Sequence, residues 1–298
     1  MITFRRVTRA PSLGAAREVH FLLHSGLRAY VIRAQRVTVE KRLHRGSVLP
    51  GTRGSRHLFQ IVLSGRMRLA HEGREVWLEP GDTSLQARGI EDERWEGDTF
   101  EAVVLEWSAG SCGAAPVHGW TLGRMDARDT NRVLKWAEST AHDDLSPERA
   151  AQHTAALIDL LRGMGVPLAR PEPSALVEPV SASTRRVAAA LGRSLSELHV
   201  RPMMVDLEAE LGRSARQLQR AITSFSRYYD YPGGSSWKHL LHCWRLAMGT
   251  TLMTAPRATT ESVAHALGYG SPQSFCLAMA QARLPSPGRI ASATKHLR

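Results

Sequence analysis

The sequence predicts an α+β fold, with an antiparallel β domain in the N-terminal part of the chain and helices after it. Up to about residue 118, short runs rich in Val, Ile, Leu and aromatic residues alternate with turn residues, as in a β-sandwich or barrel. From about residue 128 the apolar residues recur at helical spacing. A third observation is a helical pattern that occurs twice, within 205–225 and again within 262–279.

Four segments of the first part have the composition of strands. They are 27–34, 57–65, 66–78 and 99–107. Gly65 and Gly73 punctuate them as in a meander, and "EPGD" at 79–82 is typical of a tight turn. We expect one antiparallel β domain over residues 1–118.

Residues 119–180 are expected to form a helical connector followed by a linker. "DTNRVLKWAESTA" and "SPERAAQHTAALIDLLRGMG" both have an amphipathic pattern, and Ser146 before Pro147 is a helix start signal. The apolar stripe of the second helix would pack on the β domain or on a second subunit. It consists of Ala151, Ala155, Leu157, Ile158 and Leu161. Four prolines without a period make 166–183 the linker candidate.

Residues 181–298 are expected to be helical. Segment 183–198 is one helix, with Ser183 or Thr184 as a candidate N-cap. A long helical stretch at 237–253 would bridge the two copies of the repeated pattern.

Each copy of that pattern consists of two helices joined by a tight turn. In the first copy, 205–212 and 214–225 are helical, Gly212 can adopt a positive φ, and Ser214 can cap the second helix. The apolar positions, the glycine and the serine recur in the second copy. Two helices joined in this way form a helix-turn-helix, so the sequence predicts two such units.

The stretch "SARQLQRAI" at 214–222 places Leu218 and Ile222 on one face of a helix and two arginines and a glutamine on the other. A polar helix face is most often simply solvated. The charge distribution favours a different interpretation, because residues 181–298 contain 15 Lys+Arg and 6 Asp+Glu of a chain with net charge +11. A basic domain of this kind favours a polyanion partner, most often nucleic acid.

Residues 183–290 resemble the DNA-binding domain of the AraC/XylS family of bacterial transcription regulators. The resemblance is carried by "DLEAELGRSARQLQRAI", "WRLAMGTTLM", "VAHALGYGSPQSFCLAM" and "PSP". Arg245-Leu246 and Gly268-Tyr269 stand where the family has an Arg-Leu and a Gly-aromatic pair. The resemblance implies an AraC-type DNA-binding domain over 181–298, with seven helices and two helix-turn-helix units. It also implies a cupin-like barrel as the sensory domain over 1–118, where "LEPGD" is a compatible turn motif.

The resemblance implies a sequence-specific DNA-binding transcription regulator rather than an enzyme. The second helix of the first unit would enter the major groove, where Arg pairs with guanine and Gln with adenine. The expected DNA-binding residues are Ser214, Ala215, Arg216, Gln217, Gln219, Arg220, Gln273 and Ser274. The second unit is expected to contribute less, because Leu277 stands where the family commonly has a basic residue.

The chain departs from the family pattern at three further places. Glu208 replaces a small residue where the two helices of the first unit pack, so its carboxylate needs a partner or access to solvent. Leu284 stands where the family usually has glycine, and the connection at 226–237 is longer than usual. The tyrosines of that connection are expected to pack on the domain. They are Tyr228, Tyr229 and Tyr231.

The expected partners are double-stranded DNA, a small-molecule effector, a second copy of the chain, and RNA polymerase if the regulator is an activator. No metal or cofactor is expected, because three scattered cysteines form no metal-binding pair. The sequence has neither a targeting segment nor an apolar run long enough for a membrane span, so we expect a cytoplasmic protein.

Two other functions stay open at this point. One is a metal-dependent cupin enzyme with a degenerate helical tail. Its ligands would come from the histidines of the first domain, of which His20 and His24 would be neighbours on a helix. The histidines considered for this role are His20, His24, His44, His57 and His71. The other is a regulator that has lost DNA binding and acts through protein contacts.

Two features of the first domain carry weaker hypotheses. Five aromatic residues could line an apolar pocket for a ligand. They are Phe59, Trp77, Trp95, Phe100 and Trp107. The acidic stretch "EDERWEGD" at 91–98 is expected to be a solvated loop.

Overall fold

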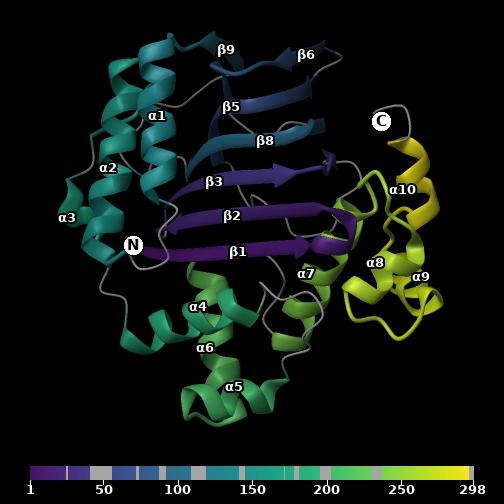
Figure 1. The fold of residues 1–298 in the computed structure, drawn as a ribbon. Helices are drawn as coiled ribbons and strands as arrows, with labels where there is room; N and C mark the ends of the chain where they lie inside the picture. The colour runs from purple at the N-terminus through teal and green to yellow at the C-terminus, as the bar shows by residue number, and fades with distance from the viewer. Residues whose placement is uncertain are drawn as a thin grey trace.

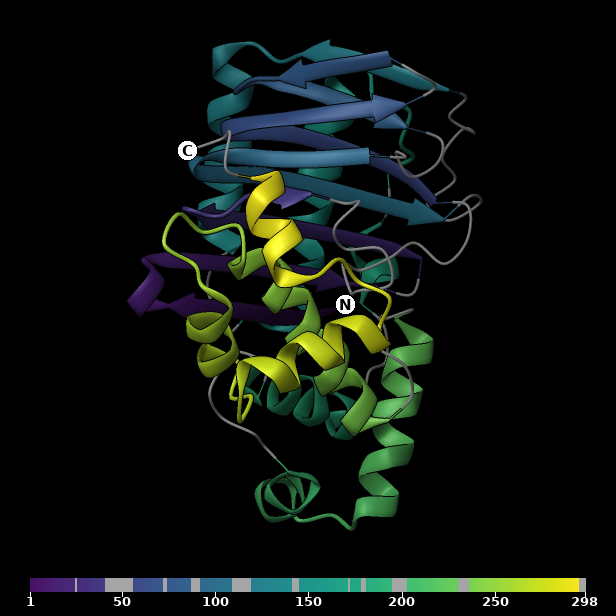
Figure 2. The same ribbon diagram turned by 90° about the vertical axis from the view of Figure 1, so that its right-hand side faces the viewer.

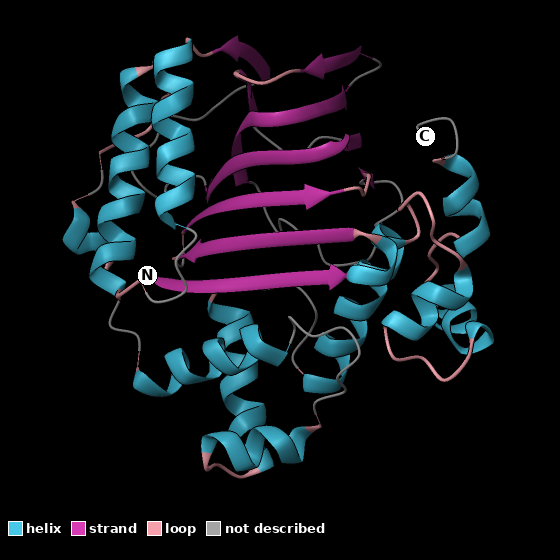
Figure 3. Ribbon diagram, viewed as in Figure 1, coloured by secondary structure: helices cyan, strands magenta, loops and turns pink. Residues whose placement is uncertain are grey.

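The computed structural model describes residues 1–24, 26–40, 56–71, 74–86, 92–108, 119–140, 145–170, 172–177, 181–194, 203–229 and 236–294. It confirms the α+β fold class, with an antiparallel sheet from the first part of the chain and helices from the rest (Figures 1 and 3). Gly73, His44 and Tyr231 lie outside the described residues.

In the described part of the chain, nine strands form one antiparallel sheet. They are β1 (Ile2–Ala10), β2 (Ala15–Leu23), β3 (Leu27–Gln35), β4 (Val39–Glu40), β5 (Arg56–His71), β6 (Arg74–Leu78), β7 (Asp82–Gln86), β8 (Asp92–Ser108) and β9 (Trp120–Arg124). Their order is β1-β2-β3-β8-β5-β7-β9, with β4 paired to β8 and β6 to β5. The pairing of β9 with β7 extends the sheet to Arg124, within the range 119–180 assigned above to the connector.

The two longest strands, β5 and β8, bend together at a pair of glycines. Their register shifts between Val62 and Arg66, which marks a β-bulge. Gly65 and Gly97 both have positive φ, and a Cβ on Gly65 would lie only 2.7 Å from the Thr99 carbonyl oxygen. The expected break between strands at Gly65 is therefore wrong, because the bulge bends a continuous strand there.

Each face of the sheet carries its own apolar layer. On one face, alternate residues such as Leu27, Val31 and Val103 pack with α1 (Ala127–Thr140), α2 (Pro147–Gly163) and α3 (Pro173–Leu176). Figure 1 shows α1 and α2 next to each other on the left of the sheet, and Figure 2 shows them behind it. The apolar stripe of α2 is buried in this layer. Of the two expected alternatives, it therefore packs on the β domain and is not available to a second subunit.

The segment at 166–183 is only partly a linker. It contains α3, and its Leu168 and Leu176 are buried beneath the sheet layer. The amino group of Met1 also donates to the Leu176 carbonyl at 2.8 Å. The connection is therefore packed against the domain despite its prolines, because the leucines between them reach the core.

The predicted helix starts are confirmed in one case and corrected in another. The Ser146 hydroxyl caps α2 by accepting from the Arg149 N–H at 3.3 Å. Ser181 caps the next helix, since its hydroxyl accepts from the Thr184 N–H at 3.1 Å, and Ser183 and Thr184 are not the cap.

Seven helices follow residue 180 in the described part of the chain, as the resemblance implies. They are α4 (Ala182–Ser194), α5 (Met204–Leu211), α6 (Ala215–Tyr228), α7 (Trp237–Leu252), α8 (Thr260–Ala266), α9 (Pro272–Gln281) and α10 (Pro287–Ala293). No helix within the described ranges is both long and apolar enough to cross a membrane.

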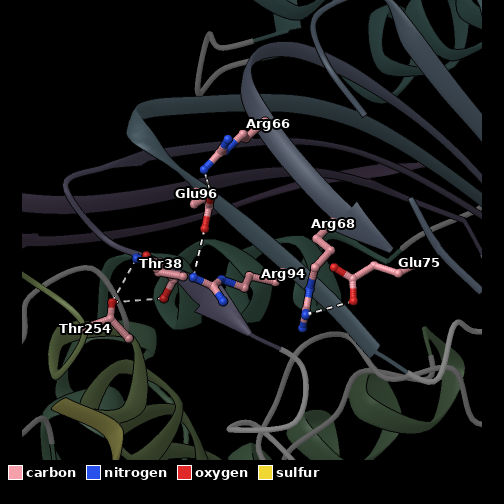
Figure 4. A network of polar contacts seen from close by, with 7 residues as sticks. All are labelled: Thr38, Arg66, Arg68, Glu75, Arg94, Glu96 and Thr254. Atoms are coloured by element: carbon pink, nitrogen blue, oxygen red, sulfur yellow. Dashed lines mark hydrogen bonds and ion pairs between the residues drawn. The ribbon is translucent and has the colours of Figure 1, made fainter. Parts of the chain in front are cut away.

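These helices share one continuous apolar cluster with the second face of the sheet. Two sets of buried polar contacts join the parts as well. The Arg28 guanidinium of β3 donates to the Tyr229 carbonyl, just after α6, at 2.5 Å. The Thr254 hydroxyl, just after α7, accepts from the Thr38 N–H at 2.8 Å and donates to the Thr38 carbonyl at 2.9 Å (Figure 4).

Figure 4 also corrects the expected acidic loop. Residues 92–98 belong to β8, and Trp95 and Glu96 are buried. The Glu96 carboxylate forms ion pairs with Arg66 and, at 2.9 Å, with Arg94. The loop prediction failed because Arg66, which is distant in the sequence, joins the nearby Arg94 in neutralising the Glu96 carboxylate.

Candidate nucleic-acid interface

The first helix-turn-helix unit consists of α5, a short turn and α6. Gly212 ends α5 with φ of 60° and ψ of 39°, the left-handed conformation that glycine adopts most easily. Ser214 precedes the first residue of α6, and its N–H donates to the Gln217 side-chain oxygen at 3.1 Å. Gln217 is therefore partly committed to capping its own helix.

Glu208 has the partner that a half-buried carboxylate needs. Its Oε1 accepts a hydrogen bond from the Ala215 N–H, the first amide of α6. The carboxylate thus acts on the N-terminal end of the second helix, where a negative charge is favourable. This departure from the family pattern is an additional link across the turn.

Helix α6 separates an apolar face from a basic one. Its inner face buries Leu218, Ile222 and Phe225 almost completely. Arg216 and Arg220 are exposed and stand one turn apart. The apolar packing therefore fixes the helix while both guanidinium groups are available to solvent or a ligand.

The other residues expected at this helix differ in how free they are. Ser214, Ala215 and Gln217 are exposed. Gln219 is half-buried, and its amide nitrogen donates to the Thr223 hydroxyl at 3.3 Å. The exposed Arg227, nearer the end of α6, is a further basic residue that the sequence analysis did not select. The helical period would have indicated it if the pattern had been followed beyond residue 225.

The second unit, α8 and α9, repeats the construction. Gly268 has a φ of 69° in the turn. The Ser271 hydroxyl caps α9 by accepting from the Ser274 N–H at 3.1 Å. Gln273 and Ser274 are exposed, and so is Leu277. Since α9 contains no charged residue, any DNA contact made by this helix relies on neutral groups.

The eight expected residues form two groups rather than one patch. Six belong to the start of α6 and two to the start of α9. In Figure 1, α6 lies below the sheet and α9 lies to its right. A ligand that meets both groups must therefore be extended, as a duplex is.

The two tyrosines at the C-terminal end of α6 have different environments. Tyr229 is buried and its ring lies 5.3 Å from that of Phe225, as expected for packing. Tyr228 is half exposed. Near the end of the second unit, Arg283 rather than Leu284 takes the left-handed conformation, with a φ of 56°, and Leu284 is buried.

The β domain does not gather the expected aromatic pocket. Trp95 and Phe100 stack at 5.2 Å on the face that meets the C-terminal helices. Phe59 and Trp107 lie on the opposite face, and Trp77 is partly exposed. The prediction was wrong because alternate strand residues point to opposite faces.

The histidines whose side chains the structure describes are not arranged as the metal hypothesis requires. His20 lies in β2 and its Nε2 is 2.5 Å from a carboxylate oxygen of Glu18, so His20 and His24 are not helical neighbours. Among the residues that the structure describes, no group of three or more His, Cys, Asp or Glu side chains could hold a metal ion.

One titratable group near the second unit has a shifted pKa. Burial lowers the pKa of His242 on α7, and the positive charges of His239, Arg245 and Lys238 lower it further. His242 is therefore neutral at physiological pH and adds no charge to the basic part of the molecule.

Neither a known family model nor a curated protein matches the sequence. Several solved structures are similar to the chain. ToxT from Vibrio cholerae O395 is 10% identical, covers 91% of this chain and 99% of its own, and has a TM-score of 0.35. The AraC-like transcriptional activator CuxR is 13% identical, covers 75% and 80%, and has a TM-score of 0.36. EutQ from Clostridium difficile is 12% identical, covers 35% and 76%, and has a TM-score of 0.25.

These likenesses concern the fold alone. CuxR is described as AraC-like, which is the family that the sequence motifs of this chain resemble. The comparison by itself says nothing of what this chain binds.

Proposed function

We propose that this chain is an AraC-type transcription regulator that reads the major groove mainly through α6. The observation that carries the proposal is the construction of α5 and α6. Two capped helices with a left-handed glycine between them bury one face of α6 and leave Arg216 and Arg220 exposed on the other. The same pair of helices around a left-handed glycine occurs again in α8 and α9, without arginines on the second helix.

We propose the following roles for the predicted residues. Arg216 and Arg220 bind guanine edges or phosphates, and Gln219 turns from Thr223 to adenine. Ser214, Ala215 and Gln217 flank these contacts at the start of the helix, where base-contacting residues of a recognition helix stand. Gln273 and Ser274 supply the weaker contacts of the second unit. All of these residues except the half-buried Gln219 are exposed, which is compatible with these roles.

In this proposal residues 1–118 are the core of a sensory domain, 119–180 connect it, and 181–298 bind DNA. A small-molecule effector acts through the sheet, and the contacts of Arg28 and Thr38 with the ends of α6 and α7 support such coupling. A second copy of the chain and, for an activator, RNA polymerase complete the set of proposed partners.

The proposal is tested by selecting binding sites for the full chain from a random duplex pool. The enriched site is then titrated at several salt concentrations with wild type and Arg220→Ala. Loss of a base contact should cost about 1–3 kcal/mol and should relax specificity at one position. Loss of a phosphate contact should weaken binding to all sequences and reduce the salt slope by about one.

A matched control is Arg289→Ala, which removes an exposed arginine from α10, outside both units. Its affinity for the enriched site should stay close to wild type. If no site is enriched with or without cell extract, or if Arg220→Ala and Arg289→Ala behave alike, direct reading by α6 is wrong.

A further inference from the structure

Arg245 joins the bridging helix α7 to the turn of the second unit. Its Nη2 donates to the Leu267 carbonyl at 2.5 Å and to the Gly268 carbonyl at 3.3 Å. These carbonyls lie at the C-terminal end of α8, where a helix favours a positive charge. The guanidinium also lies 5.3 Å from the ring centroid of Tyr269, the next residue of the turn.

A second set of contacts continues from that turn into α9 and returns to α7. The Tyr269 ring lies 5.2 Å from the ring of Phe275, which is fully buried on α9. Phe275 in turn packs against Gly249, one helical turn after Arg245. A Cβ on Gly249 would lie only 2.7 Å from a ring carbon of Phe275, so the two helices approach as closely as glycine permits.

These contacts start at Arg245 and return to Gly249. Both residues lie on the same face of α7, since positions four apart on a helix are neighbours. The arginine fixes where α8 ends, and the glycine fixes how closely α9 approaches. The direction of α9 relative to α7 is therefore set by contacts of α7 itself. An arginine suits this position because its charge persists at all physiological pH values and its Nη2 has two N–H groups, one for each carbonyl.

We propose that Arg245 is a positioning residue for the second recognition helix, and that it sets the spacing between the DNA segments contacted by α6 and α9. This inference rests on the proposed function. Arg245 does not itself need to touch DNA. It acts through Leu267 and Gly268, so its loss should disturb the second contact and leave the first intact.

The test uses the full chain and a library in which the two parts of the selected site are separated by spacers of different length. Wild type should prefer one spacing and should protect both parts from hydroxyl radicals. Arg245→Met keeps most of the side-chain volume but removes the donors. It should lose protection of the part bound by α9, accept several spacings, and bind the two-part site about tenfold more weakly, with the part bound by α6 unchanged.

Two further variants separate positioning from general effects of charge and stability. Arg245→Lys should recover part of the spacing preference, because an ammonium group can donate to one of the carbonyls. Arg257→Met removes an exposed arginine beyond the end of α7 and should keep the wild-type spacing. A merely structural role would lower the unfolding midpoint of Arg245→Met while its spacing preference stayed sharp, which would overturn the inference.

The inference and the proposed function fail in different ways. If wild type selects no DNA site, the proposed function fails. If wild type selects a site and protects only one part of it, or if Arg245→Met keeps the wild-type spacing and both protected parts, the function stands and the role of Arg245 is wrong.

Discussion

Replacing Arg28 with Met should be among the most destabilising single changes in the molecule. The Arg28 side chain is 1% exposed, and its guanidinium lies 3.7 Å from the Glu106 carboxylate, which is 3% exposed. The Tyr30 hydroxyl donates to the same carboxylate at 2.6 Å. Arg28→Met removes this ion pair from a buried carboxylate and also removes the hydrogen bond to the Tyr229 carbonyl.

The size of the effect follows from competing terms. Two unit charges at this separation attract by about 4 kcal/mol at an effective dielectric constant of about 20. Methionine offsets part of this lost attraction, because burying its apolar side chain avoids the cost of desolvating a guanidinium. Removal of one partner from a buried ion pair nevertheless costs about 3–5 kcal/mol in general, and we expect a loss in that range. Against a total stability of about 5–15 kcal/mol this is a large fraction.

Equilibrium unfolding in urea measures this loss. We expect the midpoint of Arg28→Met to fall by about 1 M or more, given a slope of about 3 kcal/mol per M. The double variant Arg28→Met/Glu106→Leu should recover most of the stability, because it replaces both members of the buried pair with apolar side chains. A loss below about 1 kcal/mol for the single variant, or no recovery in the double variant, would refute the reasoning.

Three other predictions concern backbone strain and protonation. Gly65→Ala should cost at least about 2 kcal/mol, because a left-handed alanine is strained and its Cβ meets a carbonyl oxygen at 2.7 Å. Gly288→Ala, in helix α10 with open space around it, should be neutral or stabilising, and urea unfolding of both variants compares them. Arg283→Gly should raise stability by about 0.5 kcal/mol in the same assay, because glycine relieves a left-handed conformation at some cost in unfolded-state entropy; a loss would contradict this. Folding lowers the pKa of His242 from 6.5, so the folded state favours the neutral imidazole. The resulting contribution to the free energy of unfolding is complete above about pH 6.5 and is lost as the pH falls below that value. His242→Gln should therefore have a shallower loss of thermal stability between pH 7 and pH 5.5, and an unchanged slope would argue against this assignment.

The helical part of the fold was predictable because its signals are local. Gly212 and Ser214 mark a turn through their own conformational preferences, and Leu218 and Ile222 mark the inner face through their spacing. The same local logic identified the exposed arginines. It could not identify Arg245 as a contact of the Leu267 carbonyl, because that bond joins residues 22 positions apart.

The β domain was harder because its determinants are distant in the sequence. Arginines interrupt the apolar pattern of β1, "ITFRRVTRA", so no alternation announces it. Glu96 looked solvated in the sequence because its ion-pair partner Arg66 belongs to another strand. The five aromatic residues are alike in type but point to different faces of the sheet. Only the strand register shows to which face each one points.

The cluster that unites the sheet with the C-terminal helices has a practical consequence for dissecting the molecule. A fragment that begins at residue 181 would lose the apolar surface against which its helices pack, together with the polar contacts from Arg28 and Thr38. Exposed apolar area of that kind promotes aggregation. Such a fragment should be poorly soluble on its own, and a shortened protein that keeps the sheet should behave better than one cut at the linker.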